Sequence, residues 1–176
     1  MDKKTDITQV VLDEETIKTR VKELAKEISE EYKGKDLVII GVLKGAFIFL
    51  SDLSRALTIP HKIDFISISS YGNSSVSGAV RFIMDLRDSI EGKHVLIVED
   101  ILDTGQTLDY LMETLGSRKP ASLKNCVFTR KKGKNVTTKI DYIGFEIPDV
   151  WVVGYGLDYA EKYRTLPYVG EMALEE

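Results

Sequence analysis

Three carboxylates lie within five residues near the middle of the chain, directly after an apolar run. Glu99 and Asp100 follow Val95–Val98, and Asp103 comes three residues later. Carboxylates at the end of a strand can bind sugar hydroxyls, coordinate a hard metal ion or transfer a proton. Acids before a helix can also act only as caps. The spacing alone therefore leaves a reactive site and a capping role both open.

The segment that follows these acids suits a phosphate group. Apolar residues recur with helical spacing from Leu108 to Leu115, and Gly116 closes the pattern. The first N–H groups of a helix have no partner within it, and they face the positive end of the helix dipole. We therefore expect a phosphate to bind the backbone at Thr104, Gly105, Gln106 and Thr107.

The elements that would position this site alternate between strands and amphipathic helices. Apolar residues with helical spacing predict helices around 17–28 and 46–57, in addition to the one at 108–115. For the first of these, Asp13 is the candidate cap and Gly34 the candidate stop. Apolar runs predict strands at 37–41, 63–68, 80–84, 95–98, 123–128, 142–145 and 150–153. This alternation predicts an α/β fold with a doubly wound, mainly parallel sheet flanked by helices. With no visible linker or repeat, residues 1–176 are expected to form a single domain.

Composition narrows the function. The only cysteine, Cys126, lies in an apolar run. One cysteine and two histidines are too few for the usual four-ligand His/Cys metal site, so any bound metal is expected to be an oxygen-bound ion such as Mg²⁺. The net charge of −4 argues against general nucleic-acid binding. Without a signal peptide or an apolar stretch of membrane-spanning length, we expect a cytoplasmic protein with no membrane partner.

The run from Val95 to Thr107 resembles the phosphoribosyl pyrophosphate signature of the type I phosphoribosyltransferases. Its Glu-Asp-x-x-Asp-Thr-Gly form resembles the branch of that family that uses 6-oxopurines. The resemblance implies the type I phosphoribosyltransferase fold, with a small hood region and a mobile loop at about residues 70–80. It also implies transfer of a phosphoribosyl group from phosphoribosyl pyrophosphate to N9 of hypoxanthine or guanine, which gives IMP or GMP.

The same resemblance assigns roles to the mid-chain acids and to two further segments. Asp103 would be the catalytic residue that manages the proton at N7, and Glu99 and Asp100 would contact the ribose. Magnesium would be the cofactor, with Glu99, Asp100 and Asp158 as its ligands. Lys44, Gly45 and Arg164 would bind pyrophosphate, and the peptide between Leu43 and Lys44 would be cis. Ser70 and Tyr71 would belong to the lid.

The resemblance also implies a purine site. Trp151, the only tryptophan, would stack on the base and the backbone at Val152 would contact its edge, although a lone tryptophan is more often part of a core. The donor to the purine 6-oxo oxygen is a lysine in the family. Counting back from Asp141 places Arg130 there, and its neighbour Lys131 is the alternative if the register is off by one.

The chain is expected to act as a homodimer or homotetramer. A competing hypothesis is a phosphoribosyltransferase-like regulator that senses nucleotides and binds nucleic acid. Its support is the segment from Arg118 to Lys139, which holds eight Lys and Arg residues and no acid. The acidic net charge and the intact set of site residues favour the enzyme.

Overall fold

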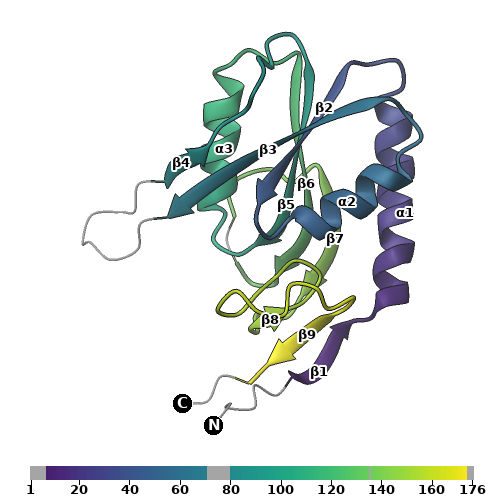
Figure 1. The fold of residues 1–176 in the computed structure, drawn as a ribbon, viewed down its shortest axis with the longest axis vertical. Coiled ribbons are helices and arrows are strands. Elements are labelled where there is room, and N and C mark those ends of the chain that lie inside the picture. The colour runs from purple at the N-terminus through teal and green to yellow at the C-terminus, as the bar shows by residue number, and fades with distance from the viewer. Residues whose placement is uncertain (1–6, 71–79, 135, 174–176) are drawn as a thin grey trace.

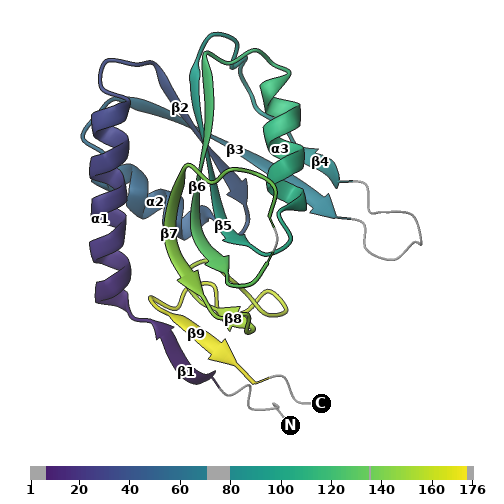
Figure 2. The ribbon, with the colours of Figure 1, turned by 180° about the vertical axis from the view of Figure 1, so that it is seen from behind.

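The computed structural model describes residues 7–70, 80–134 and 136–173. A six-stranded sheet carries helices on both faces, and a three-stranded sheet lies beside its lower end (Figures 1 and 2). The strands are β1 (Ile7–Leu12), β2 (Leu37–Leu43), β3 (His61–Ser70), β4 (Val80–Met84), β5 (His94–Leu102), β6 (Ser122–Lys131), β7 (Tyr142–Ile147), β8 (Val152–Val153) and β9 (Val169–Met172). The helices are α1 (Glu14–Glu31), α2 (Phe47–Ala56) and α3 (Gln106–Gly116).

The large sheet confirms the predicted fold class. Its order is β4-β3-β2-β5-β6-β7, and every neighbouring pair is parallel except β3 with the edge strand β4. Within the described residues, no helix is long and apolar enough to cross a membrane. The predicted lid residue Tyr71 and the loop after it lie outside the described residues, as does the side chain of Ser70, which ends β3.

Two cores, one on each face, explain why the central strand is apolar throughout. Leu96 and Val98 of β5 pack in the core that contains α1 and α2, whereas Val95 and Ile97 pack in the core that contains α3. Successive side chains of a strand point to opposite faces, so a strand covered on both sides needs an unbroken apolar run. Most of the apolar residues with helical spacing are buried in these cores, although Leu57 and Met112 are only partly buried, and α2 also buries Phe49, which the spacing did not include.

The end of α1 was predicted less accurately than its beginning. Asp13 caps the helix as expected, because its carboxylate accepts a hydrogen bond from the N–H of Thr16 at 2.8 Å. The helix stops at Glu31, before the glycine at position 34 that was expected to end it.

The three-stranded sheet is the predicted hood region. Its order is β1-β9-β8, with both pairs antiparallel, so the two ends of the described chain lie side by side (Figure 1). The sequence predicted β8 but neither β1 nor β9. This sheet holds the segment around residues 150–158 against the lower end of the large sheet, where β5 and β6 end.

Candidate active site

The strand order changes direction between β2 and β5, and the predicted catalytic segments lie there. From β2 the chain moves outward to β3, and from β5 it moves to the other side through β6. In open α/β sheets such a switch point opens a crevice at the carboxyl ends of the strands. Lys44 and Gly45 follow β2, while Glu99 and Asp100 lie near the end of β5. The topology therefore brings the two predicted motifs together.

Gly45 and Asp100 touch at this point. A Cβ atom at position 45 would overlap Oδ2 of Asp100, so only glycine allows this approach. The hydroxyl of Thr129 on β6 donates a hydrogen bond to the carbonyl of Asp100 at 3.0 Å and fixes the end of β5. The peptide between Leu43 and Lys44 is cis, which confirms the expectation for this loop.

Glu99 and Asp100 form a buried pair of acids. Burial raises the pKa of Glu99 well above its usual range, and the neighbouring Asp100 charge adds to the effect. Burial also raises the pKa of Asp100, against the opposing charge of Arg164. Glu99 Oε2 is buried with no hydrogen-bond partner among the described residues. This unpaired oxygen could accept a hydrogen bond from a ligand hydroxyl or coordinate a cation.

The segment after Asp103 opens α3 as the sequence predicted. Gly105 is the N-cap in the left-handed conformation (φ 83°), and no side chain caps the helix. A Cβ atom there would lie 2.8 Å from Cγ1 of Val136, so space and conformation both favour glycine. The first N–H groups of α3 are therefore left for an anion. Thr104 and Gln106 are exposed at this helix end.

A cavity of about 220 Å³ lies beside these strand ends and is closed on one side by the hood. It is lined by residues from the end of β5, the end of β6 and the hood, namely Asp100, Ile101, Asp103, Lys131, Trp151, Val152, Leu157 and Asp158. The side chain of Trp151 is 48% exposed, so it lies outside the core and faces the cavity. The structure thus brings together the residues predicted for the ribose, the base and the metal.

Arg130, which the count from Asp141 favoured, is not among these lining residues, whereas the alternative, Lys131, is. Arg130 forms an ion pair with Glu146 on β7 and is 40% exposed, whereas Lys131 lines the cavity and is 12% exposed. Neighbouring side chains on a strand point to opposite faces, so only one of the two can enter the cavity. Lys131 Nζ lies 3.7 Å from Asp103 Oδ2 and 3.2 Å from Asp149 Oδ1.

The two cations predicted for pyrophosphate lie close together and have acidic partners from one hood loop. Lys44 forms an ion pair with Glu161 at 2.7 Å, and this contact lowers the pKa of the Glu161 carboxyl. Arg164 bonds Asp158 at 2.9 Å and donates to the carbonyl of Gly156 at 2.8 Å. A Cβ atom at position 156 would overlap the carbonyl oxygen of Gly45, so the hood loop rests directly on the β2 loop.

The donor set fits a magnesium ion that shares its ligands with substrate. Within residues 7–70, 80–134 and 136–173, no three His, Cys, Asp or Glu side chains converge as a metal-binding cluster. Mg²⁺ usually takes one or two carboxylates and completes its shell with water and phosphate oxygens. Asp100 and Asp158 line the same cavity, and Glu99 adds an unpaired buried oxygen beside them.

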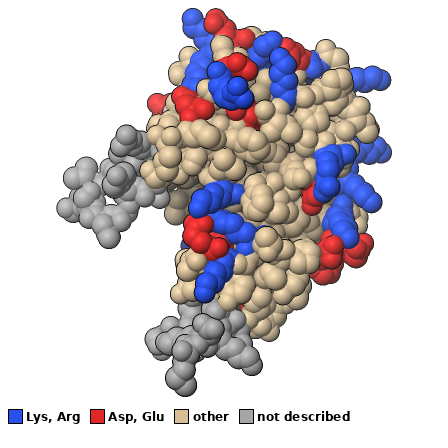
Figure 3. Space-filling view, in the orientation of Figure 1, with Lys and Arg blue, Asp and Glu red and all other residues tan. Residues whose placement is uncertain are grey.

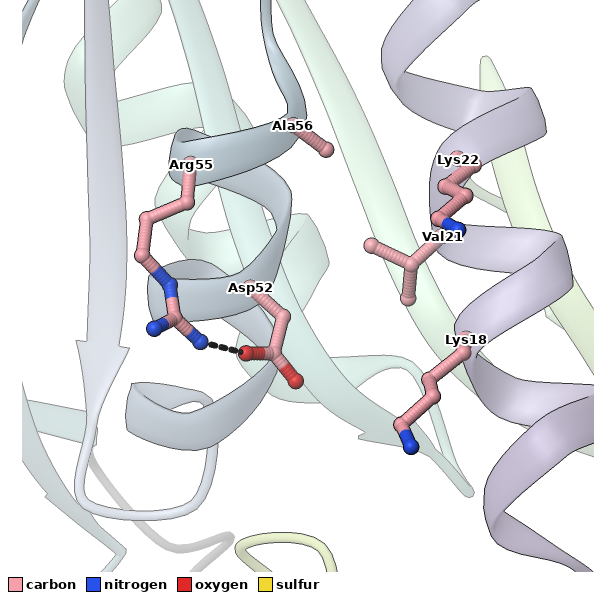
Figure 4. A pocket seen from close by; sticks show the side chains of 6 residues that line it. All are labelled: Lys18, Val21, Lys22, Asp52, Arg55 and Ala56. Carbon is pink, nitrogen blue, oxygen red and sulfur yellow. Dashed lines mark hydrogen bonds and ion pairs between the residues drawn. The ribbon is translucent and has the colours of Figure 1, made fainter.

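A second cavity, of about 430 Å³, lies between α1 and α2 (Figure 4). It is lined by Lys18, Val21, Lys22, Asp52, Arg55 and Ala56. Arg55 and Asp52 pair with each other at 2.5 Å, and Lys18 pairs with Glu14 and Glu15 on its own helix. Its lining comes only from these two helices and includes none of the predicted site residues. The smaller cavity remains the candidate active site.

The basic segment at 118–139 does not form an open cationic surface. Six of its eight cations form ion pairs with carboxylates: Arg118, Lys124, Arg130, Lys131, Lys134 and Lys139. On the face seen in Figure 3, blue and red side chains likewise gather together, with broad uncharged areas between the groups. This pairing removes the main support for a nucleic-acid site.

Sequence reasoning missed three charged residues at the site: Lys134, Asp149 and Glu161. Each forms an ion pair with a residue that the sequence did single out. Lys134 pairs with Asp103, Asp149 pairs with Lys131, and Glu161 pairs with Lys44. Asp149 lies two residues before Trp151, which the sequence analysis assigned to the base. The signal that could have identified Asp149 was its negative charge, which complements the positive charges of the 118–139 segment.

Comparisons with known proteins agree with this geometry. A family model described as the phosphoribosyl transferase domain matches residues 8–160. A hypoxanthine-guanine phosphoribosyltransferase of Dictyostelium discoideum is 52% identical over 95% of this chain and 96% of its own length. A protein of the same name from Bacillus subtilis is 49% identical, covering 95% of this chain and 94% of its own. The crystal structure of a hypoxanthine phosphoribosyltransferase from Staphylococcus aureus superposes with a TM-score of 0.91, at 44% identity over 96% of this chain and 92% of that one.

Proposed function

The chain belongs to the phosphoribosyl transferase domain family, and from this we propose that it is a purine salvage enzyme. It transfers the phosphoribosyl group of phosphoribosyl pyrophosphate to N9 of hypoxanthine or guanine and releases pyrophosphate. The observation that carries this proposal is the cavity in which a carboxylate, an ammonium group and an indole meet beside the uncapped end of α3. These groups suit the base, and the helix end suits the 5′-phosphate.

The base is held by groups from three elements. Trp151 stacks on the purine plane, and the backbone at Val152 contacts the edge of the base. Lys131 donates a hydrogen bond to the 6-oxo oxygen, in place of Arg130. Asp103 handles the proton at N7 as bond formation at N9 changes the acidity of the ring. The proposal is supported by the position of all four residues around one cavity.

The sugar and its phosphate occupy the end of β5 and the start of α3. The backbone N–H groups from Thr104 to Thr107 bind the 5′-phosphate. Glu99 and Asp100 accept hydrogen bonds from the ribose hydroxyls and stabilise the positive charge that develops on the ribose. Such stabilisation is strongest where water is excluded, and Glu99 is 7% exposed.

The leaving group faces the β2 loop. Lys44, the backbone of Gly45 and Arg164 bind pyrophosphate, and the planar guanidinium suits two phosphate oxygens at once. Binding replaces the pairs that Lys44 and Arg164 make with Glu161 and Asp158. Magnesium, when bound by Glu99, Asp100 and Asp158, would neutralise part of the pyrophosphate charge. Ser70 and Tyr71 are proposed to cover the site.

We also propose a cytoplasmic protein that acts as a homodimer or homotetramer. Cys126 is buried and free, and burial raises the pKa of its thiol, which fits an inert core residue in a reducing compartment. Among similar structures is a Trypanosoma cruzi hypoxanthine phosphoribosyltransferase studied for the role of its C-terminal region in oligomeric state and activity. That protein superposes with a TM-score of 0.90 at 44% identity.

The test is a pyrophosphate-release assay with phosphoribosyl pyrophosphate and one purine at a time. Hypoxanthine and guanine should each release pyrophosphate, and adenine should not, because its 6-amino group would oppose the ammonium group of Lys131 with N–H donors. Xanthine, tested beside them, completes the ranking of bases. Release with adenine at a comparable rate would contradict the proposed base recognition. A chain inactive with every purine but able to bind nucleic acid would instead be the regulator.

A further inference from the structure

Four charges of alternating sign form a ring at the base end of the cavity. Asp103 follows β5, Lys131 ends β6, Lys134 lies after β6, and Asp149 follows β7. Lys131 lies 3.2 Å from Asp149 and 3.7 Å from Asp103, and Lys134 lies 2.8 Å from Asp149 and 3.5 Å from Asp103. Both ammonium groups are thus nearer to Asp149 than to Asp103.

The strand register fixes this arrangement. Lys131 pairs with Ile147 in the parallel ladder of β6 and β7, and the N–H of Lys132 donates to the carbonyl of Ile147 at 2.9 Å. Asp149 comes two residues after this pair, so the ladder carries its carboxylate toward Lys131. Asp149 lies in the bend two residues after the hydrogen-bonded end of β7, and Asp103 lies in the turn between β5 and α3.

The ring has a consequence for Asp103. Its Oδ1 is buried and accepts no hydrogen bond from the described residues, and both of its ion-pair distances are long. Lys131 is the most enclosed member of the ring, and an enclosed ammonium group requires a carboxylate partner. If Asp149 lost its charge, Asp103 would be the only carboxylate left in the ring, and both lysines would pair with it.

We propose that Asp149 is a positioning residue for base recognition. It holds the ammonium groups of Lys131 and Lys134 away from Asp103, so that Lys131 stays directed at the 6-oxo oxygen and Asp103 stays available to N7. The proposal rests on the proposed function, and it adds a residue that does not itself touch the base. Lys134 and Lys131 both lower the pKa of the Asp149 carboxyl, which keeps its charge at neutral pH.

The central variant is Asp149→Asn, which keeps the shape of the side chain and removes its charge. The KM for hypoxanthine and guanine should rise about 10- to 100-fold, the range of one charge-assisted hydrogen bond, while the KM for phosphoribosyl pyrophosphate stays near wild type. Asp149→Glu should recover much of the loss. Glu146→Gln is the matched control, because it removes a carboxylate that pairs with Arg130 outside the cavity.

A second measurement separates positioning from a structural role. Trp151 is the only tryptophan and lines the cavity, so its fluorescence reports IMP or GMP binding without turnover. In an Asp103→Asn background, Asp149→Asn should weaken nucleotide binding much less than it does in wild type, because no carboxylate remains to capture the lysines. The thermal midpoints of the variants give the control for folding.

These measurements distinguish the inference from a purely structural role of Asp149. A purine-selective loss that shrinks in the Asp103→Asn background supports the inference. The inference would be overturned by any of three results: an unchanged purine KM in a folded Asp149→Asn variant, an equal loss for both substrates, or the same loss in both backgrounds. The proposed function would still stand in these cases, provided that the wild-type chain turns over 6-oxopurines. A wild-type chain that uses no 6-oxopurine would overturn both.

Discussion

Replacing Lys131 by alanine should damage purine use far more than replacing its neighbour Arg130. Lys131 is 12% exposed and lines the cavity, while Arg130 is 40% exposed and pairs with Glu146. A hydrogen bond from a charged donor is worth about 1.5–3 kcal/mol, which corresponds to roughly 10- to 150-fold in kcat/KM for hypoxanthine. An exposed ion pair such as that of Arg130 contributes about 0–1 kcal/mol, and to stability rather than to catalysis.

The assay is steady-state kinetics of both variants with hypoxanthine and guanine, at saturating phosphoribosyl pyrophosphate and then with that substrate varied. Lys131→Ala should lower kcat/KM for the purines and leave the KM for phosphoribosyl pyrophosphate near wild type, and Arg130→Ala should resemble wild type. The reasoning is refuted if Arg130→Ala causes the purine-specific loss and Lys131→Ala does not. Thermal midpoints of both variants control for misfolding.

Three further predictions address the acid, the metal and stability. Asp103→Asn should slow the chemical step by about 10²–10⁴-fold in single-turnover assays and spare binding of phosphoribosyl pyrophosphate, and a near-normal rate would make Asp103 a structural cap. Excess EDTA should abolish turnover and added Mg²⁺ restore it; full activity in EDTA would exclude a required divalent ion. Arg118 bonds Asp85 through both terminal nitrogens at 2.8 Å and lowers the pKa of that carboxyl. Because the folded-state pKa is depressed, this stabilisation exists above the ordinary value of 3.8 and is lost as pH falls through the folded-state value. Asp85→Asn should therefore reduce the free energy of unfolding by up to about 1 kcal/mol at pH 7. In denaturant titrations this difference should shrink as pH falls below 3.8, and a difference that stays constant would contradict the linkage.

The large sheet could be predicted because its strands must be apolar on both faces. Val95–Val98 is an unbroken apolar run that supplies two cores, and this pattern is unusual outside a covered parallel strand. The hood strands β1 and β9 carry no such signal. They are short, and β1 is largely exposed, so their pairing depends on tertiary contacts between distant parts of the chain.

The site could be predicted where a motif is contiguous and not where it depends on strand register. Residues 99–107 form one local unit. β5 runs to Leu102, four residues beyond the predicted strand, so Glu99 and Asp100 belong to β5, and α3 begins at Gln106 as the helical pattern predicted. The position of Lys131 depends on which face of β6 turns toward the cavity, and counting residues from Asp141 could not decide between neighbours. The partners Asp149 and Glu161 come from segments distant in sequence, and only the folded arrangement brings them to Lys131 and Lys44.

A crystal structure of the protein with IMP bound would test the central claim most directly. We predict the 5′-phosphate at the backbone N–H groups of residues 104–107, the base beside Trp151, Nζ of Lys131 within hydrogen-bonding distance of the 6-oxo oxygen, and Asp103 at N7. Binding of IMP in the cavity between α1 and α2, or a base contacted by Arg130 instead of Lys131, would contradict the account.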